Sequence, residues 1–172
     1  MRVLRVTRDL GLPNWCIGAG ALRNAVWDSL HAYAKPSLPG DIDVAYFDAA
    51  DLSRDRDRDL DRLLASLEPA FKWEVTNQAG VHLWFEQVFA HAVEPLCSIE
   101  EAVASWPETA TSVAVRLDRN GTIHVIAPLG LADLFHMVVR RNPRRVSVET
   151  YRQRVAAKRY SDRWPLVQII PA

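Results

Sequence analysis

Two aspartates separated by one residue are the first candidates for chemistry. The segment Asp41-Ile42-Asp43-Val44 begins a predicted strand over residues 41–47. Side chains two residues apart on a strand share a face and lie about 7 Å apart along it, so Asp41 and Asp43 would project together. Two carboxylates on one face repel each other, and a divalent cation removes that repulsion. The pattern predicts a metal site, and the alternative is a polar stripe on a solvent-facing edge strand.

A glycine-rich segment provides a candidate site for phosphate. Gly18-Ala19-Gly20 lies between a predicted strand at residues 15–17 and a predicted helix at residues 21–31. The free amides and the dipole of a helix start bind anions, and glycine lets a phosphate approach without a Cβ in the way. Arg23 in the first helical turn, with Asn24 beside it, can reach the same anion. The alternative is a tight strand-to-helix turn with a solvent-exposed Arg23.

A third carboxylate, Glu74, falls on the polar face of a strand predicted over residues 71–76, where apolar and polar residues alternate. Next to bound metal, Glu74 would serve as a further ligand or as the general base for an attacking hydroxyl. The alternative is an exposed glutamate or one in a salt bridge. Asn77 and Gln78, which follow the strand, would contact a base or ribose, or else shape a turn.

The elements that must hold these residues mix strands and helices without strict alternation, which predicts an α+β fold. The length of 172 residues fits one domain. Residues 77–96 carry no clear pattern. Further helices are expected at residues 1–12, 53–67, 98–105, 131–140 and 148–159, and further strands at residues 111–117 and 122–127. The turn at residues 118–121 has the composition of a hairpin.

Charge is distributed unevenly along the chain. Residues 140–163 hold nine basic and two acidic residues, a formal charge of +7, which leaves −7 on the remainder because the chain totals zero. Arg154 and Lys158 lie one helical turn apart and share a face. This basic helical segment would bind substrate phosphates or a nucleic-acid backbone, or it would dock on the acidic remainder of the chain. By contrast, the alternating Arg and Asp residues at positions 53–62 predict a solvated helix face.

Composition excludes several classes of protein. Hydrophobic residues make up 49% of the chain and charged residues 24%, so a folded core is expected and disorder is not. The N-terminal residues lack the apolar core of a signal peptide, and no stretch approaches the roughly 20 apolar residues of a membrane span. The two cysteines make no disulfide framework, so a reduced, cytoplasmic setting is the simpler interpretation. The five histidines show no metal-ligand spacing.

Taken together, these motifs resemble the nucleotidyltransferase superfamily of the DNA polymerase β type. The Gly-x-x-Arg-Asn step is similar to a segment of tRNA CCA-adding enzymes, and the chain looks still more like a family of small bacterial nucleotidyltransferase-like proteins of unassigned substrate. The shared motifs are Gly-Ala-Gly-x-x-Arg-Asn-x-Val-Trp-Asp at residues 18–28, Asp-Ile-Asp-Val-x-Tyr-Phe-Asp at 41–48, Trp-Glu-Val-x-Asn-Gln-Ala at 73–79, Trp-Pro-Glu-Thr-Ala-Thr at 106–111 and Ala-Pro-x-Gly-Leu-x-Asp-Leu at 127–134.

The resemblance implies a single domain over residues 1–172 with a mixed sheet flanked by helices. It implies that Asp41 and Asp43 hold Mg²⁺ or Mn²⁺, that Glu74 completes the catalytic set, and that the glycine turn and Arg23 face a triphosphate. The implied activity is metal-dependent transfer of a nucleoside monophosphate from a nucleoside triphosphate to an unknown hydroxyl acceptor. Two residues depart from the superfamily pattern: Ala19 stands where Ser or Gly is usual, and Glu74 where Asp is usual. The alternatives are an inactive nucleotide-binding module and an RNA- or protein-interaction module on the same fold.

Overall fold

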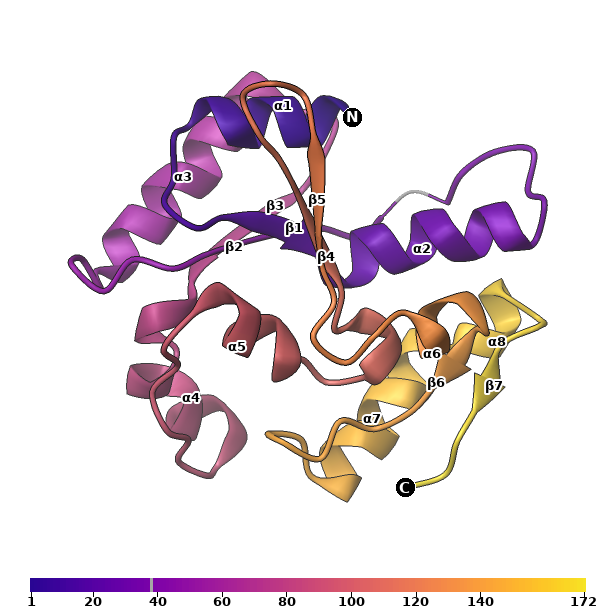
Figure 1. Cartoon of the computed structure of the whole chain (residues 1–172). Coiled ribbons are helices and arrows are strands. Elements are labelled where there is room, and N and C mark those ends of the chain that lie inside the picture. The colour runs from indigo at the N-terminus through magenta and orange to yellow at the C-terminus, as the bar shows by residue number, and fades with distance from the viewer. Residues whose placement is uncertain (38) are drawn as a thin grey trace.

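The computed structural model describes residues 1–37 and 39–172 and contains a five-stranded mixed sheet (Figure 1). The strands lie in the order β3-β2-β1-β4-β5, with β2 and β3 parallel and the other neighbours antiparallel. Their bounds are β1 Cys16–Gly18, β2 Ile42–Tyr46, β3 Trp73–Asn77, β4 Ala114–Leu117 and β5 Ile123–Ile126. The predicted α+β class, the mixed sheet and the hairpin that joins β4 to β5 are confirmed.

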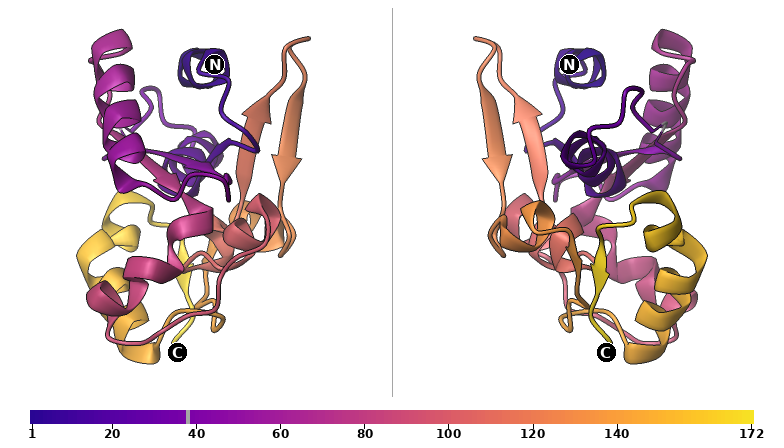
Figure 2. Two further views of the ribbon diagram at one scale, coloured as in Figure 1. Left: turned by 90° about the vertical axis from the view of Figure 1, so that its left-hand side faces the viewer. Right: turned by 90° about the vertical axis from the view of Figure 1, so that its right-hand side faces the viewer.

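Helices cover both faces of this sheet. Figure 1 shows α1 and α3 above it and α4, α5 and α7 below it, and Figure 2 shows α1 between α3 and the β4–β5 hairpin. The α-helices are α1 Arg2–Asp9, α2 Ala19–Leu30, α3 Arg54–Leu67, α4 His82–Phe89, α5 Ile99–Ala104, α6 Ala132–Phe135, α7 Val148–Lys158 and α8 Tyr160–Arg163. Two single 3₁₀ turns, η1 Gln78–Gly80 and η2 Thr109–Thr111, complete the helical elements.

The pleat of the strands divides the core between the two faces. Ile17 and Val44 belong to the cluster that packs against α1 and α3, whereas Cys16 and Ala45 belong to the cluster that packs against α5. A third cluster joins α2 to the C-terminal segment, with Trp27 and Trp164 completely buried at its centre. Their rings meet edge to face at 5.3 Å, an arrangement that aromatic pairs favour. The C-terminal segment is therefore packed against α2.

The charged helix α3 differs in part from its predicted role as a solvated face. Pairs such as Arg62 with Asp59 do lie on its surface. However, Asp61 accepts a hydrogen bond from the backbone N–H of Val75 at 2.7 Å, and Asp57 accepts one from the N–H of Asn77 at 3.2 Å. Because β3 is an edge strand, these aspartates satisfy N–H groups that no neighbouring strand takes up.

The predicted helix over residues 131–140 is wrong beyond its first turn. α6 ends at Phe135, and Met137 adopts a left-handed backbone conformation with φ of 57°. Val138 and Val139 then form strand β6, which pairs in parallel with β7 at Gln168–Ile169. Pairing with a distant segment has overridden the local helical pattern. No helix within residues 1–37 and 39–172 has the length and apolar character needed to cross a membrane.

Candidate active site

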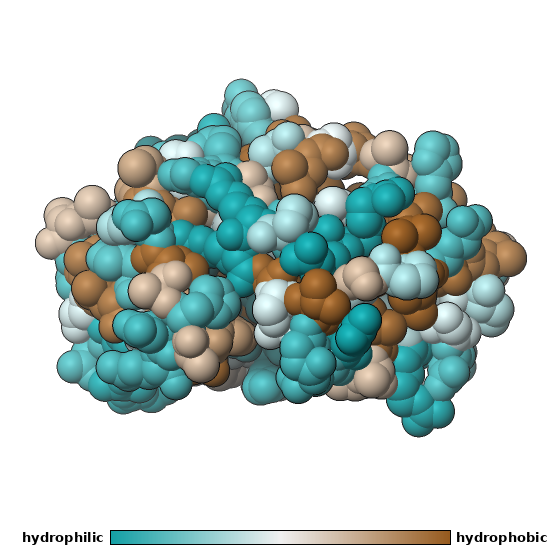
Figure 3. All heavy atoms as spheres, turned by 90° about the horizontal axis from the view of Figure 1, so that it is seen from below, coloured by the Kyte–Doolittle hydropathy of each residue, from teal (hydrophilic) through white to brown (hydrophobic). Residues whose placement is uncertain are grey.

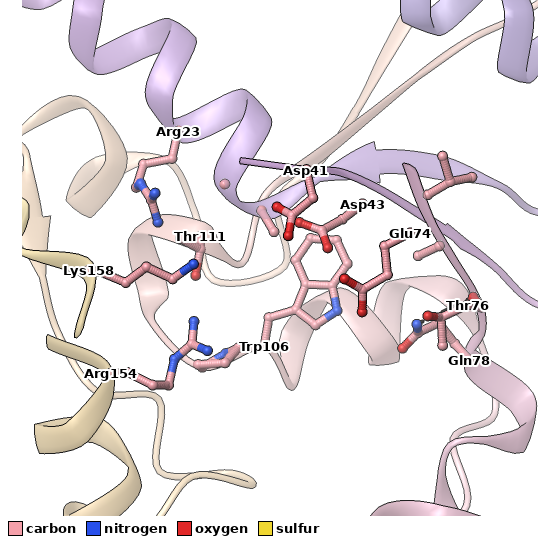
Figure 4. A pocket seen from close by; sticks show the side chains of 15 residues that line it. Arg23, Asp41, Asp43, Glu74, Thr76, Gln78, Trp106, Thr111, Arg154 and Lys158 are labelled. Carbon is pink, nitrogen blue, oxygen red and sulfur yellow. Dashed lines mark hydrogen bonds between the residues drawn. The ribbon is translucent and has the colours of Figure 1, made fainter. Parts of the chain in front are cut away.

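Three carboxylates converge at one end of the parallel strand pair. Asp41 directly precedes β2, Asp43 lies in β2, and Glu74 lies opposite Asp43 in the register of β3. One carboxylate oxygen from each residue lies within 4.8 Å of those of the other two (Figure 4). Ile42 and Val44 are buried in the core, as the alternation of the strand predicts. The structure thus brings together the three acidic residues that the sequence singles out.

The acidic cluster carries an electrostatic cost. The pKa of Asp43 is raised to about 6, mainly by burial and then by the neighbouring charges of Asp41 and Glu74, against opposing effects from Lys158 and Arg154. Three hard oxygen donors at this spacing are the ligands that Mg²⁺ and Mn²⁺ prefer. A divalent cation would also neutralise the repulsion that disfavours the ionised form of Asp43. The donor set therefore fits such an ion.

The glycine-rich segment is tighter than the predicted turn, because β1 ends at Gly18 and α2 begins at Ala19. The N–H of Ala19 donates to the carbonyl of Val113 at 3.3 Å. A Cβ on Gly18 would lie 2.5 Å from the ring of Trp106, so this glycine is required by packing. At Gly20 a Cβ would meet only Arg23 Nη2, at 3.8 Å. Ala19 and Gly20 line the cavity in front of the carboxylates, and Gly18 does not.

Arg23 is buried, with only 4% of its surface exposed, so the alternative of a solvent-exposed arginine is wrong. Its guanidinium carbon lies 4.9 Å from the ring centre of Tyr160, 5.3 Å from that of Trp27 and 5.7 Å from that of Trp164. Nη2 donates to Oδ1 of Asn24 at 2.8 Å. Asn24 is itself buried outside the cavity lining, and its contact is with Arg23.

The Arg23 guanidinium lacks a carboxylate partner among the described residues, and its Nε atom has no hydrogen-bond partner there. Burial lowers the pKa of Arg23. A buried charge is unfavourable unless it is paired and hydrogen-bonded, and cation–π contacts with three rings offset only part of that cost. Because Arg23 also lines the cavity, an anion entering there would complete its environment.

Helix α7 contributes two further cations to the cavity, Arg154 and Lys158 (Figure 4). Arg154 forms a two-point ion pair with Glu108, at 2.9 Å from Nε to Oε1 and 3.3 Å from Nη2 to Oε2. The side chain of Glu108 is only 1% exposed. Lys158 is exposed and makes no ion pair with a described residue. Both residues predicted from the basic segment therefore reach the cavity, and Arg154 also neutralises a buried carboxylate.

The two residues after β3 behave differently. Gln78 lines the cavity, whereas Asn77 lies outside its lining. The Asn77 side chain accepts hydrogen bonds from the N–H groups of Asp48 and Ala79, at 3.0 and 3.2 Å, and donates to the carbonyls of Asp48 and Asp51, both at 2.8 Å. These contacts match the turn-shaping alternative for Asn77.

The cavity that these groups surround, which we call the polar cavity, has a volume of about 300 Å³. It is also lined by Thr76, Trp106, Pro107 and Thr111, for which sequence reasoning gave no role. The motif at residues 106–111 indicated that this segment matters in the family it resembles. It could not show that the segment lies beside the carboxylates, because a motif alone gives no position in space. The polar cavity has carboxylates on one wall and the side chains of arginine and lysine on the other. This distribution of charge is complementary to a ligand that consists of a cation and an anion.

Comparison with known proteins shows the family. A family model described as nucleotidyltransferase matches residues 5–169. This chain belongs to that nucleotidyltransferase family, and its sheet with flanking helices is the corresponding fold. Among proteins with curated descriptions, none matches the chain.

Several solved structures share the fold. One, described as the NMR structure of a protein that reveals a CCA-adding enzyme head domain, is 29% identical with a TM-score of 0.84, over 100% of this chain and 89% of that one. The Thermotoga maritima CCA-adding enzyme complexed with tRNA is 12% identical with a TM-score of 0.56. A tRNA nucleotidyltransferase complexed with a primer tRNA and an incoming ATP analog is 17% identical with a TM-score of 0.55. In both comparisons 98% of this chain is aligned, but it covers only 38% and 46% of the length of those two enzymes. At these identities the two enzymes show the fold alone.

Proposed function

We propose that this protein transfers a nucleoside monophosphate from a nucleoside triphosphate to a hydroxyl acceptor, with a divalent metal ion held by Asp41, Asp43 and Glu74. The observation that carries the proposal is the pairing, across one cavity, of three clustered carboxylates with the buried Arg23. Carboxylates bind the cation and a guanidinium binds phosphate oxygens, so the cavity is complementary to a metal–triphosphate complex.

The residues of the chain divide the work. Arg23 and Lys158 would bind the phosphates that leave, and Gly20 leaves room for their close approach. When bound, Mg²⁺ or Mn²⁺ supplies charge neutralisation around the reacting phosphate. The acceptor oxygen forms a bond to the α-phosphorus, the bond from that phosphorus to pyrophosphate breaks, and the hydroxyl proton passes to the carboxylate of Glu74.

The contacts of the basic segment indicate that most of its side chains bind other parts of this chain. They therefore do not favour an extended binding surface for nucleic acid. Of its nine basic residues, four pair with carboxylates, which are Arg140 with Asp133, Arg144 with Glu101, Arg154 with Glu108 and Arg159 with Asp162. Arg141 and Arg145 donate to backbone carbonyls. Three of the four carboxylates lie outside the segment, as expected if it docks on the acidic remainder.

Calorimetric titration with the four ribonucleoside triphosphates, with and without Mg²⁺, tests the proposal. We expect Mg²⁺-dependent binding that Asp41→Asn/Asp43→Asn weakens by at least about tenfold, since the metal ligands are removed. The matched control is Asp55→Asn/Asp59→Asn, which removes two exposed aspartates from α3 and should leave binding unchanged. A nucleotide affinity that changes neither with Mg²⁺ nor in the double variant would contradict the metal role. No binding of any nucleotide would contradict the proposal. Binding without any transfer product would identify an inactive nucleotide-binding module.

A further inference from the structure

A second cavity, of about 280 Å³, lies beside the polar cavity and shares part of its wall. The residues that line both cavities are Glu74, Thr76, Gln78, Trp106, Pro107 and Arg154. The rest of the second wall is largely apolar. We call it the aromatic cavity, after the four rings that line it, which belong to Trp84, Phe85, Phe89 and Trp106.

Helix α4 forms one side of the aromatic cavity and is poorly anchored in the fold, since none of its residues is buried. Its rings nevertheless contact one another, with Phe85 and Phe89 at 4.5 Å between ring centres. Figure 3 shows the face of the molecule on which α4 and α7 lie, where hydrophobic and hydrophilic side chains stand next to each other. Aromatic side chains left at a cavity wall favour a flat apolar ligand.

The position of Glu74 connects this cavity to the proposed reaction. A general base must lie within hydrogen-bond reach of the hydroxyl from which it takes the proton. In Figure 4, Arg23 and Lys158 lie on one side of the carboxylates, and Thr76 and Gln78 lie on the other, next to Glu74. Attacking and leaving oxygens are roughly in line across the phosphorus, so the acceptor enters opposite the cations that hold the leaving phosphates. On that side, Glu74, Thr76 and Gln78 also line the aromatic cavity, so the acceptor would enter from there.

The charges around the aromatic cavity restrict the acceptor further. Arg145 and Arg154 line it, and the guanidinium carbon of Arg145 lies 5.7 Å from the ring centre of Phe85. Among the described residues that line the aromatic cavity, Glu74 is the single carboxylate. The charge of Arg154 is balanced by Glu108, whereas Arg145 has no carboxylate partner among the described residues. The guanidinium group of Arg145 therefore disfavours a polycationic acceptor and tolerates a neutral or negatively charged one.

We propose that the aromatic cavity holds the acceptor, a small hydroxyl-bearing molecule with a flat apolar body and neutral or negative charge. This inference rests on the proposed function, because it takes the polar cavity as the site of the nucleotide. An RNA acceptor is disfavoured because most of the basic residues nearby are engaged within the chain.

Ligand-observed NMR tests the proposal with three hydroxylated probes: neutral 4-fluorobenzyl alcohol, anionic 4-(hydroxymethyl)benzoate and cationic glucosamine. We expect the two aromatic probes to bind and glucosamine not to. Phe85→Ala should weaken their binding by about tenfold or more, because it removes a stacking ring. Leu83→Ala is the matched control, since Leu83 is on the same helix, is 58% exposed and lies outside the cavity lining. Lys158→Ala, which changes only the polar cavity, should leave probe binding intact.

A parallel titration with Mg²⁺ and nucleoside triphosphate separates this inference from the proposed function. Lys158→Ala should weaken nucleotide binding, while Phe85→Ala should leave it within about twofold of the unchanged protein. If Phe85→Ala weakened nucleotide binding as much as Lys158→Ala does, the aromatic cavity would be the site of the nucleobase. That result would overturn the inference. Preference for glucosamine would overturn it, as would binding of a short RNA that depends on Phe85 without binding of either aromatic probe. Failure of nucleotide binding in every protein would instead contradict the proposed function.

Discussion

Replacing Arg154 by methionine should destabilise the folded protein, because it leaves the carboxylate of Glu108 buried without its cation. The Glu108 side chain is 1% exposed, and Arg154 meets both of its oxygens. Methionine keeps much of the apolar volume of the arginine stem, so the substitution tests the charge more than the packing.

The magnitude follows from the geometry. Removing one partner of a buried ion pair destabilises by about 3–5 kcal/mol. The lower end applies here, because the Arg154 side chain is 34% exposed and the hydroxyl of Thr111 still donates to Glu108 Oε2 at 3.0 Å. We therefore expect the free energy of unfolding to fall by about 3 kcal/mol. Glu108→Gln/Arg154→Met should recover at least half of that loss, since no buried charge remains.

Urea unfolding followed by tryptophan fluorescence at pH 7 measures these differences. The control is Arg152→Met on the same helix, an exposed residue with no ion pair in the described part of the chain, which should change stability by less than about 0.5 kcal/mol. The reasoning is refuted if Arg154→Met is as stable as the control, or if the double variant is no more stable than Arg154→Met alone.

Three further predictions follow from the site. Gly18→Ala should destabilise the fold by about 1–3 kcal/mol in urea unfolding, because the new Cβ would meet Trp106 and the Val113 carbonyl. Gly20→Ala should leave stability unchanged or raise it by up to about 1 kcal/mol, since alanine favours the helix, yet weaken Mg²⁺–nucleotide binding in calorimetry; retained affinity would contradict the phosphate site. The pKa of Asp43 in the folded, metal-free protein is raised to about 6, so protonation of Asp43 stabilises that state. The free energy of unfolding of the metal-free protein should therefore fall as pH rises through that value. Protons compete with the ion, so the rise in melting temperature caused by Mn²⁺ should be larger at pH 7.5 than at pH 5.5, and an equal rise would contradict the assignment.

Local periodicity was sufficient to predict the acidic strand. The two-residue repeat of a strand places Ile42 and Val44 in the core and Asp41 and Asp43 together, and the structure has this arrangement. The polar face of Glu74 was predictable in the same way. Its place opposite Asp43 was not, because the register between two strands depends on contacts that no single segment encodes.

Long-range packing explains most of what the sequence left open. Arg23 is buried because Tyr160 and Trp164, from the far end of the chain, pack around its guanidinium. Asp57 and Asp61 looked like part of a solvated charge pattern, and they bind an edge strand that only the folded sheet creates. The aromatic cavity depends on α4, from a segment without clear periodicity, because its rings face a cavity and not the core.

A crystal structure with Mn²⁺ and a non-hydrolysable nucleoside triphosphate analogue, with anomalous scattering used to locate the metal, tests the central claim most directly. We predict manganese bound by Asp41, Asp43 and Glu74, with the triphosphate extending towards Gly20 and Arg23. Manganese or nucleotide bound elsewhere, with these residues uncontacted, would contradict the account.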